Sequence, residues 1–136
     1  MYKPALYDEK NKLSCEKEKR ESKMKKTTML KKNYEFRNVL TKGKRFRATY
    51  IEIYTKRNNL QENKLGIAIS SKVANSVNRN RIKRLIRENY RLVEEKINTG
   101  YSFVILWNKN KNVEEANFNN IKNDISKFIE KTNLSI

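Results

Sequence analysis

The sequence has no histidine and a single cysteine, Cys15, among its 136 residues. Without histidine the chain lacks the commonest general acid or base of enzyme active sites and the commonest metal ligand. One cysteine excludes a disulfide framework or a thiolate metal site within the chain, and a lone thiol in a charged stretch fits a reducing compartment. These absences argue against catalysis by the protein itself.

Glycine, proline and long apolar runs are also scarce. The chain has three glycines and one proline, and it carries no glycine-rich loop of the kind that cradles phosphates. No apolar run approaches the roughly 18 residues that a membrane-spanning helix needs, and the N-terminus has no apolar signal-peptide core. We therefore expect a soluble, cytoplasmic protein with no membrane partner.

Positive charge is what the sequence has in excess. It contains 32 lysines and arginines against 15 acidic residues, a formal net charge of +17. Such an excess predicts a polyanionic partner, with nucleic acid as the first candidate and an anionic membrane surface as the second. Lysine is common along the whole chain, so the position of the charge is more informative than its total.

The length suits one compact domain with a tail. Residues 1–26 carry charges of both signs and few apolar side chains, a composition that cannot offset the entropy cost of ordering. We expect this segment to be a charged, flexible N-terminal extension, although a translation start near Met24 would remove most of it. Residues 27–136 should then form the folded domain.

Hydrophobic periodicity predicts the elements of that domain. Apolar residues at helical spacing predict three helices, at residues 30–40, 77–97 and 114–131. The first helix has Asn33 as its expected N-cap and Gly43 at its end. β-Branched and aromatic residues predict strands at residues 46–56, 65–70 and 101–107. Because a helix separates the last two strands, they can pair in parallel, and we expect an α+β sandwich of one sheet with helices packed on it.

The helix expected at residues 77–97 has a concentrated basic face. Its predicted apolar stripe consists of Ile82, Leu85, Ile86, Val93 and Ile97. On a helical wheel, the residues opposite this stripe are Asn80, Arg84, Arg87 and Arg91, with Arg81 and Lys83 at the flanks. Arg79 falls near the apolar side, so we expect it to lie in the first turn and point elsewhere. Unopposed like charges one turn apart cost stability, whereas guanidinium groups match phosphate oxygens. We interpret the face as a phosphate-binding surface, the alternative being an ordinary solvated helix face.

Aromatic and small residues mark a second candidate surface. Tyr50 and Tyr54 lie two strand steps apart on one predicted face, and Phe36 precedes them on the first helix. Aromatic rings on an open sheet face can stack unpaired bases. Small residues on one face of the strand at 65–70 leave room for something to lie against it. The alternative interpretation is that these aromatics are core residues.

No other grouping in the sequence carries chemistry. The acidic residues have no metal-binding or acid–base spacing. Ser70 and Ser71 have no histidine to activate them. We therefore expect neither a catalytic residue nor a metal site in the protein.

The segment LGIAISSKVANSVNRNRIKRLIRENYR, residues 65–91, resembles the signature of the bacterial ribonuclease P protein component. Its most specific part is the Arg-Asn-Arg block at 79–81 and the residues that follow as far as Glu88. The likeness extends from about Leu30 to Phe128 and includes LKKNYEF and IEIYT. It implies a mostly four-stranded sheet in the order αβββαβα, with a left-handed crossover around the basic helix.

The resemblance also implies a function. In that family the RNA subunit, with Mg²⁺, removes the 5′ leader of precursor tRNA, and the protein subunit is not expected to act alone. The basic helix faces the RNA subunit, and a cleft between the first helix and the sheet holds the leader. With the residue pattern, this assigns to the RNA-subunit surface Arg79, Asn80, Arg81, Lys83, Arg84, Arg87 and Arg91. It assigns to the leader cleft Phe36, Tyr50, Tyr54, Ser70 and Lys72.

Three positions depart from the usual pattern of that family. Ser71 stands where a lysine is usual, Ala74 where a glycine is usual, and Leu40 where a cleft phenylalanine is common. The first departure removes a phosphate contact and the third removes a stacking surface. Both bear on the affinity for the leader.

Three other functions stay open from the sequence. One is a ribosomal or other structured-RNA-binding protein, which would bind RNA without stimulating leader removal. Another is a DNA-binding protein with the basic helix in a major groove, disfavoured because strands rather than a helix-turn-helix partner precede Asn78. The last is a nuclease that needs no RNA subunit.

Overall fold

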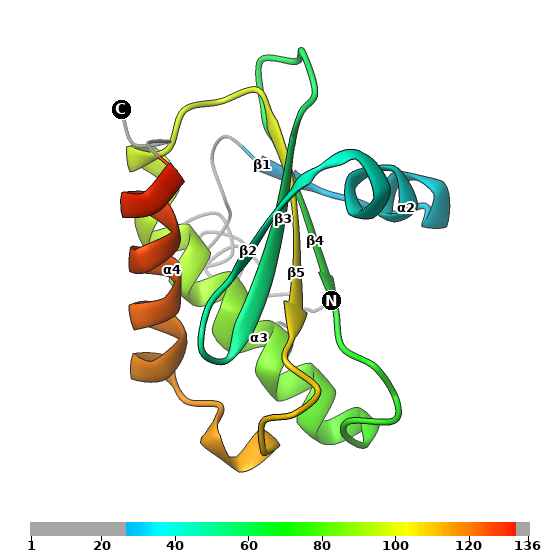
Figure 1. The fold of residues 1–136 in the computed structure, drawn as a ribbon, viewed down its shortest axis with the longest axis vertical. Coiled ribbons are helices and arrows are strands. Elements are labelled where there is room, and N and C mark those ends of the chain that lie inside the picture. The colour runs from blue at the N-terminus through cyan, green and yellow to red at the C-terminus, as the bar shows by residue number, and fades with distance from the viewer. Residues whose placement is uncertain (1–26, 133–136) are drawn as a thin grey trace, which may run out of the picture.

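A computed structural model describes residues 27–132 (Figure 1). The expected N-terminal extension and Cys15 therefore lie outside the described residues. The elements are β1 (Thr27–Met29), α2 (Asn33–Lys42), β2 (Lys44–Arg47), β3 (Ile51–Arg57), β4 (Asn63–Ala68), α3 (Ser76–Val93), η1 (Glu94–Lys96), β5 (Tyr101–Trp107), η2 (Val113–Glu115) and α4 (Phe118–Thr132). In this part of the chain, no helix combines the length and apolar character needed to cross a membrane.

The strands form one mixed sheet in the order β1-β4-β5-β3-β2. β4 pairs with β5 in parallel, as predicted, and β3 pairs with β5 and β2 in antiparallel fashion. The sheet has one strand more than the four that the family resemblance implies, because β1 pairs in parallel with β4, with Thr27 opposite Asn63. A strand of three residues is too short to show a period in sequence. The left-handed crossover stays a prediction.

The single strand predicted at residues 46–56 is wrong, because this segment is a hairpin of β2 and β3. Lys44 pairs with Thr55 and Arg47 with Glu52, and the backbone N–H of Ala48 donates to the carbonyl of Ile51 at 2.9 Å. The turn contains neither glycine nor proline. Instead, the Asp124 carboxylate accepts from the Tyr50 backbone N–H at 2.7 Å, a contact that no local pattern reveals.

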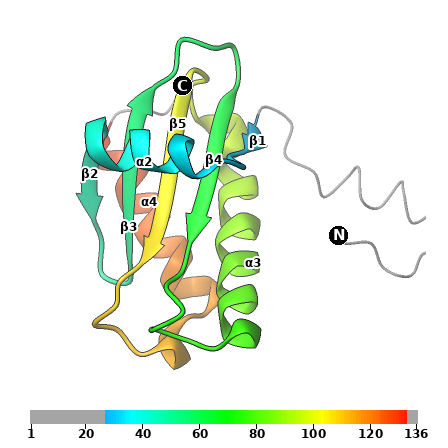
Figure 2. The same cartoon turned by 90° about the vertical axis from the view of Figure 1, so that its right-hand side faces the viewer.

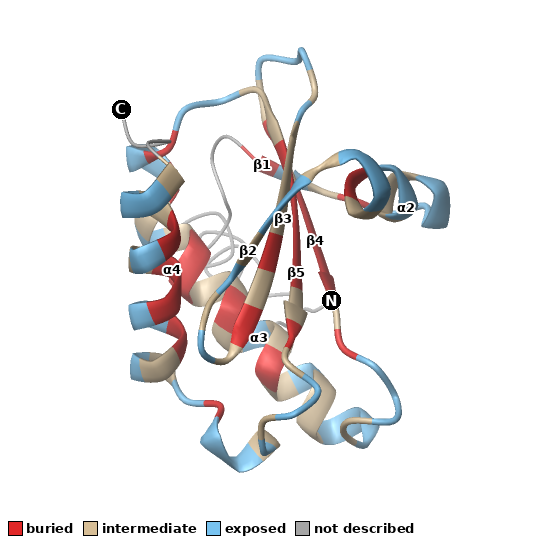
Figure 3. Cartoon of the chain, in the orientation of Figure 1, coloured by how far each residue is buried: buried red, intermediate tan, exposed pale blue. Residues whose placement is uncertain are grey.

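Helices cover the two faces of the sheet unequally, as Figure 2 shows: α2 lies alone across one face, and α3 and α4 cover the other. The main core lies on the side of α3 and α4, where buried residues line the facing surfaces (Figure 3). Ile82 and Ile86 of α3 are fully buried there, which confirms the predicted apolar stripe. A smaller cluster under α2 contains Leu30, Val39 and Val104.

Helix boundaries differ from the predictions at several ends. The N-cap of α2 is Lys32 rather than Asn33, and Gly43 ends the helix as expected. Asn75 caps α3, its side chain accepting from the Asn78 N–H at 2.9 Å. The α-helix stops at Val93, and η1 follows it. The α4 helix begins at Phe118 rather than at residue 114, because the preceding residues form η2.

Candidate nucleic-acid interface

The predicted basic face of α3 lies opposite the buried stripe of that helix. Asn80 and Arg84 are exposed, and Lys83, Arg87 and Arg91 are half-exposed. Since α3 packs on the sheet face opposite α2 (Figure 2), its polar side points away from the body of the molecule. The helix therefore presents guanidinium and ammonium groups on one outer surface, which we call the α3 face.

Arg79 and Arg81 also bond to the protein's own backbone. The Arg79 guanidinium donates to the Ala74 carbonyl at 2.8 Å and so holds the chain just before the helix. Arg79 therefore lies near the start of α3 and points away from the α3 face, as predicted. The Arg81 guanidinium donates to the carbonyls of Ala116 at 2.8 Å and Val113 at 3.0 Å. Arginine has five N–H donors, so both can still contact a phosphate, but Arg81 has a structural role that the sequence did not reveal.

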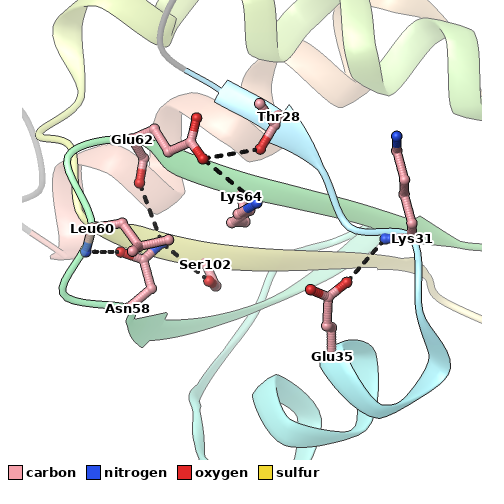
Figure 4. Close-up of polar contacts among 8 residues, drawn as sticks. All are labelled: Thr28, Lys31, Glu35, Asn58, Leu60, Glu62, Lys64 and Ser102. Atoms are coloured by element: carbon pink, nitrogen blue, oxygen red, sulfur yellow. Dashed lines mark hydrogen bonds and ion pairs between the residues drawn. The ribbon is translucent and has the colours of Figure 1, made fainter.

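Glu35 fixes the start of α2, and Figure 4 shows its contact with Lys31. Its carboxylate accepts from the backbone N–H groups of Lys31 and Lys32, each at 3.1 Å. These hydrogen bonds lower the pKa of the Glu35 carboxyl below its ordinary value. At the other end, the Gly43 N–H donates to the Val39 carbonyl at 2.8 Å. Both ends of α2 are thus defined, which fixes the position of its apolar side on the sheet.

Phe36 of α2 lies directly against Gly66 of β4. A Cβ atom at Gly66 would lie 2.6 Å from Cε1 and 2.8 Å from Cζ of the Phe36 ring, so a larger residue there would have to displace that ring. The space predicted beside the small residues of this strand is therefore occupied by the Phe36 ring. Tyr54 and Leu40 pack in the same cluster with Val104, so the structure brings Phe36 and Tyr54 together.

The sheet continues beyond the strip that α2 covers. Tyr54, Val104 and Gly66 are paired across three strands, and Glu52, Leu106 and Ala68 form the next row. The members of that next row are half-exposed, and no helix crosses the nearby ends of β4 and β5 (Figure 2). We call the set Phe36, Tyr54, Ala68 and Leu106 the α2-side surface. Ala68 is one of the small residues predicted to line this face of the strand. Leu106 was not predicted, although strand alternation from Val104 places it there.

Tyr50 does not belong to this surface. The prediction that Tyr50 and Tyr54 share one strand face is wrong, because Tyr50 precedes β3 and packs against the core on the side of α3 and α4. Its ring stacks on Trp107 with centroids 5.9 Å apart. Burial, and next the neighbouring Glu115, raise the pKa of the Tyr50 hydroxyl. The residue therefore supports the hairpin turn.

Ser70 and Lys72 lie in the loop between β4 and α3. The strand ends at Ala68, two residues earlier than predicted. The Ser70 hydroxyl accepts from the Lys72 backbone N–H at 3.1 Å, and both residues are exposed. They follow the end of the α2-side surface along β4 and precede α3. Within residues 27–132, no group of three or more acidic, cysteine or histidine side chains is arranged to hold a metal ion.

Comparison with known proteins gives the same family at the level of sequence and of structure. A family model described as Ribonuclease P matches residues 24–133. The ribonuclease P protein component of Thermoanaerobacter sp. (strain X514) is 37% identical, over 80% of this chain and 92% of the relative. That of Clostridioides difficile (strain 630) is 38% identical, over 81% and 96%.

Solved structures agree with these matches. The Staphylococcus aureus RNase P protein is 26% identical with a TM-score of 0.68, and the match covers 78% of this chain and 95% of that one. The Thermotoga maritima RNase P protein, at 20% identity, supports the fold alone, with a TM-score of 0.67 over 76% and 96% of the two chains. With its arginine-rich α3 and its α+β sandwich, the chain belongs to the ribonuclease P protein component family, the RNA-binding proteins of a tRNA-processing ribonucleoprotein.

Proposed function

We propose that this chain binds the RNA subunit of ribonuclease P through its α3 face and the 5′ leader of precursor tRNA through its α2-side surface. By doing so it promotes endonucleolytic removal of the leader and formation of the mature 5′ end. The observation that carries the proposal is the separation of the two surfaces: the basic helix and the half-exposed aromatic residues lie on opposite faces of one sheet.

The α3 face suits a structured RNA backbone. Arginine presents a planar fork of donors that matches phosphate oxygens, and Arg84 is exposed on this face. Each neutralised phosphate releases counterions, so binding should be strong at low salt and fall steeply as salt rises. Contacts of this kind position the protein without reading a sequence.

The α2-side surface suits an unpaired strand. Phe36 and Tyr54 are half-exposed, so part of each aromatic ring can stack on a base. Such stacking contributes about 1–3 kcal/mol of binding free energy per base. Ser70 and Lys72 follow at the end of β4 and can donate to a phosphate. Stacking tolerates any base, as a leader of variable sequence requires.

We place the hydrolysis, and the Mg²⁺ that it uses, with the RNA subunit. The chain has no histidine to serve as a general base, which supports a role in binding and orientation only. The same proposal places the protein in the cytoplasm, with the RNA subunit and precursor tRNA as its partners.

The test is cleavage of precursor tRNA by a bacterial ribonuclease P RNA at low Mg²⁺, with and without this protein, and with an RNA-free protein control. We expect cleavage only when both components are present. Binding of the RNA without restored cleavage would favour a general structured-RNA-binding protein. Cleavage by rigorously RNA-free protein would favour a protein-only nuclease.

A further inference from the structure

A hollow of about 440 Å³ lies between the β2–β3 turn and the last part of α4. It is lined by Phe46, Arg47 and Thr49 on one side and by Lys127, Glu130 and Lys131 on the other. The strand β2 forms one edge of the sheet, whereas α3 contacts β4 near the opposite edge. The hollow is therefore distinct from both the α3 face and the α2-side surface.

The lining of the hollow has more positive than negative charge, with three cationic residues, Arg47, Lys127 and Lys131, and one acidic residue, Glu130. Lys127 and Lys131 are exposed and one helical turn apart, an arrangement that costs stability through repulsion. Among residues 27–132, neither ammonium group forms an ion pair with a carboxylate. The Arg47 guanidinium lies 3.5 Å from Glu52, but Arg45 approaches the same carboxylate oxygen at 3.4 Å, and the Arg47 side chain is 64% exposed.

The floor of the hollow is apolar and held in place. The Phe46 ring packs edge-on against Phe128, with centroids 5.5 Å apart, and Phe128 is buried in the main core. The charged side chains at the rim therefore lie beside a packed apolar floor. Such a site suits a ligand that brings negative charge to the rim.

We propose that this hollow binds phosphates of an RNA backbone, as a third contact besides the α3 face and the α2-side surface. The inference rests on the proposed function, because that function makes RNA the polyanion within reach. The volume of the hollow admits a nucleotide-sized group, and the cations Arg47, Lys127 and Lys131 complement phosphodiester oxygens. The phosphates can come from the RNA subunit or from precursor tRNA, and the chemistry is the same for both.

The test compares two double variants with equal loss of charge. Lys127→Ala with Lys131→Ala changes the hollow. Lys109→Ala with Lys122→Ala is the control: Lys109 follows β5, and Lys122 lies about 140° around α4 from Lys127. Dissociation constants are measured against salt for the RNA subunit, and for precursor tRNA with the preassembled holoenzyme. Thermal unfolding checks that all variants fold.

We expect the hollow variant to lose about fivefold or more in affinity relative to the control, with a log–log salt slope shallower by about 1–2. Lys127→Arg with Lys131→Arg should restore both. A loss confined to the RNA subunit assigns the phosphates to that RNA, and a loss confined to precursor tRNA assigns them to the substrate. Either result supports the site.

Equal affinities for the hollow and control variants, while the wild-type chain binds RNA, would overturn this inference and leave the proposed function intact. A hollow variant that keeps RNA binding but loses binding to polyglutamate would overturn it in favour of an acidic protein partner. Failure of the wild-type chain to bind either RNA would instead reject the proposed function.

Discussion

Gly66 shows how one small residue positions the α2-side surface. A Cβ atom there would lie 2.6 Å from Cε1 of Phe36 and 3.0 Å from Cδ1 of Leu30. We expect Gly66→Ala to lower the free energy of unfolding by about 1–3 kcal/mol, because the Phe36 ring must shift within a packed cluster. Urea denaturation measures the change.

The Phe36→Ala background provides the control for this steric explanation. With the ring absent, the added methyl group meets fewer atoms. Gly66→Ala should therefore lower the free energy of unfolding by less in this background than in the wild-type chain, because the two sites are coupled. The same cost in both backgrounds would mean that the effect comes from the backbone of β4 and not from the ring.

Tyr90 joins α3 to two strands inside the core. Its hydroxyl lies 2.8 Å from the Thr27 hydroxyl, and the Asn63 side-chain amide donates to it at 3.5 Å. Burial is the main cause that raises the pKa of Tyr90 from 10.0 to about 12. The unfolded chain therefore loses this proton at lower pH than the folded chain. The raised pKa of Tyr90 therefore adds to the free energy of unfolding. This contribution is fully present below pH 10 and is lost as the pH rises toward about 12.

Tyr90→Phe tests this linkage. The wild-type unfolding free energy should fall with pH more steeply than that of the variant above pH 10, by a slope approaching about 1.4 kcal/mol per pH unit. Below pH 10 the variant should be less stable by about 1 kcal/mol, since it loses the hydroxyl hydrogen bonds. Urea denaturation across this pH range gives both values, and parallel pH profiles would contradict the assignment.

At the scale of elements, Arg81 connects α3 to the segment before α4. Its guanidinium reaches two carbonyls, those of Val113 and Ala116, which one ammonium group cannot reproduce in the same geometry. Arg81→Lys should therefore destabilise the fold by about 1–2 kcal/mol. The matched change Arg84→Lys, on the exposed side of the same helix, should cost within about 0.5 kcal/mol. Equal losses in chemical denaturation would refute this role for Arg81.

The α3 face should carry a measurable share of the salt dependence of RNA binding. Arg84→Ala with Arg87→Ala should weaken binding of the RNA subunit and make the log–log salt slope shallower by about 2, since about 0.9 is lost for each phosphate contact. Filter binding at several salt concentrations measures the slope. Lys109→Ala with Lys122→Ala removes the same charge elsewhere, and a slope change no larger than in that control would argue against the face.

Elements with a strong internal pattern could be predicted from sequence. The apolar stripe and basic face of α3 are both contained in one helix, and its buried residues Ile82 and Ile86 followed from spacing alone. By contrast, the hairpin turn before β3 depends on Asp124, which is 74 residues from Tyr50 in sequence. The contacts of Arg81 are with carbonyls 35 and 32 residues away. Only the folded chain reveals such partners.

At the scale of the whole molecule, the sheet separates two kinds of contact. Its α2 side offers aromatic and small residues, and its other side is covered by the helix that carries the basic face. In the proposed holoenzyme, one protein could therefore contact the RNA subunit and the leader at once without competition between them. Loss of the α2-side surface should then affect substrates only when they carry a leader.

The most direct test of this division is the affinity of the reconstituted holoenzyme for precursor and mature tRNA, measured with the wild-type protein and with Tyr54→Ala. Loss of one stacked base, worth about 1–3 kcal/mol, predicts that precursor tRNA binds about tenfold more weakly while mature tRNA binds as before. Equal weakening of both tRNAs, or no weakening of either, would contradict the assignment of the leader to this surface.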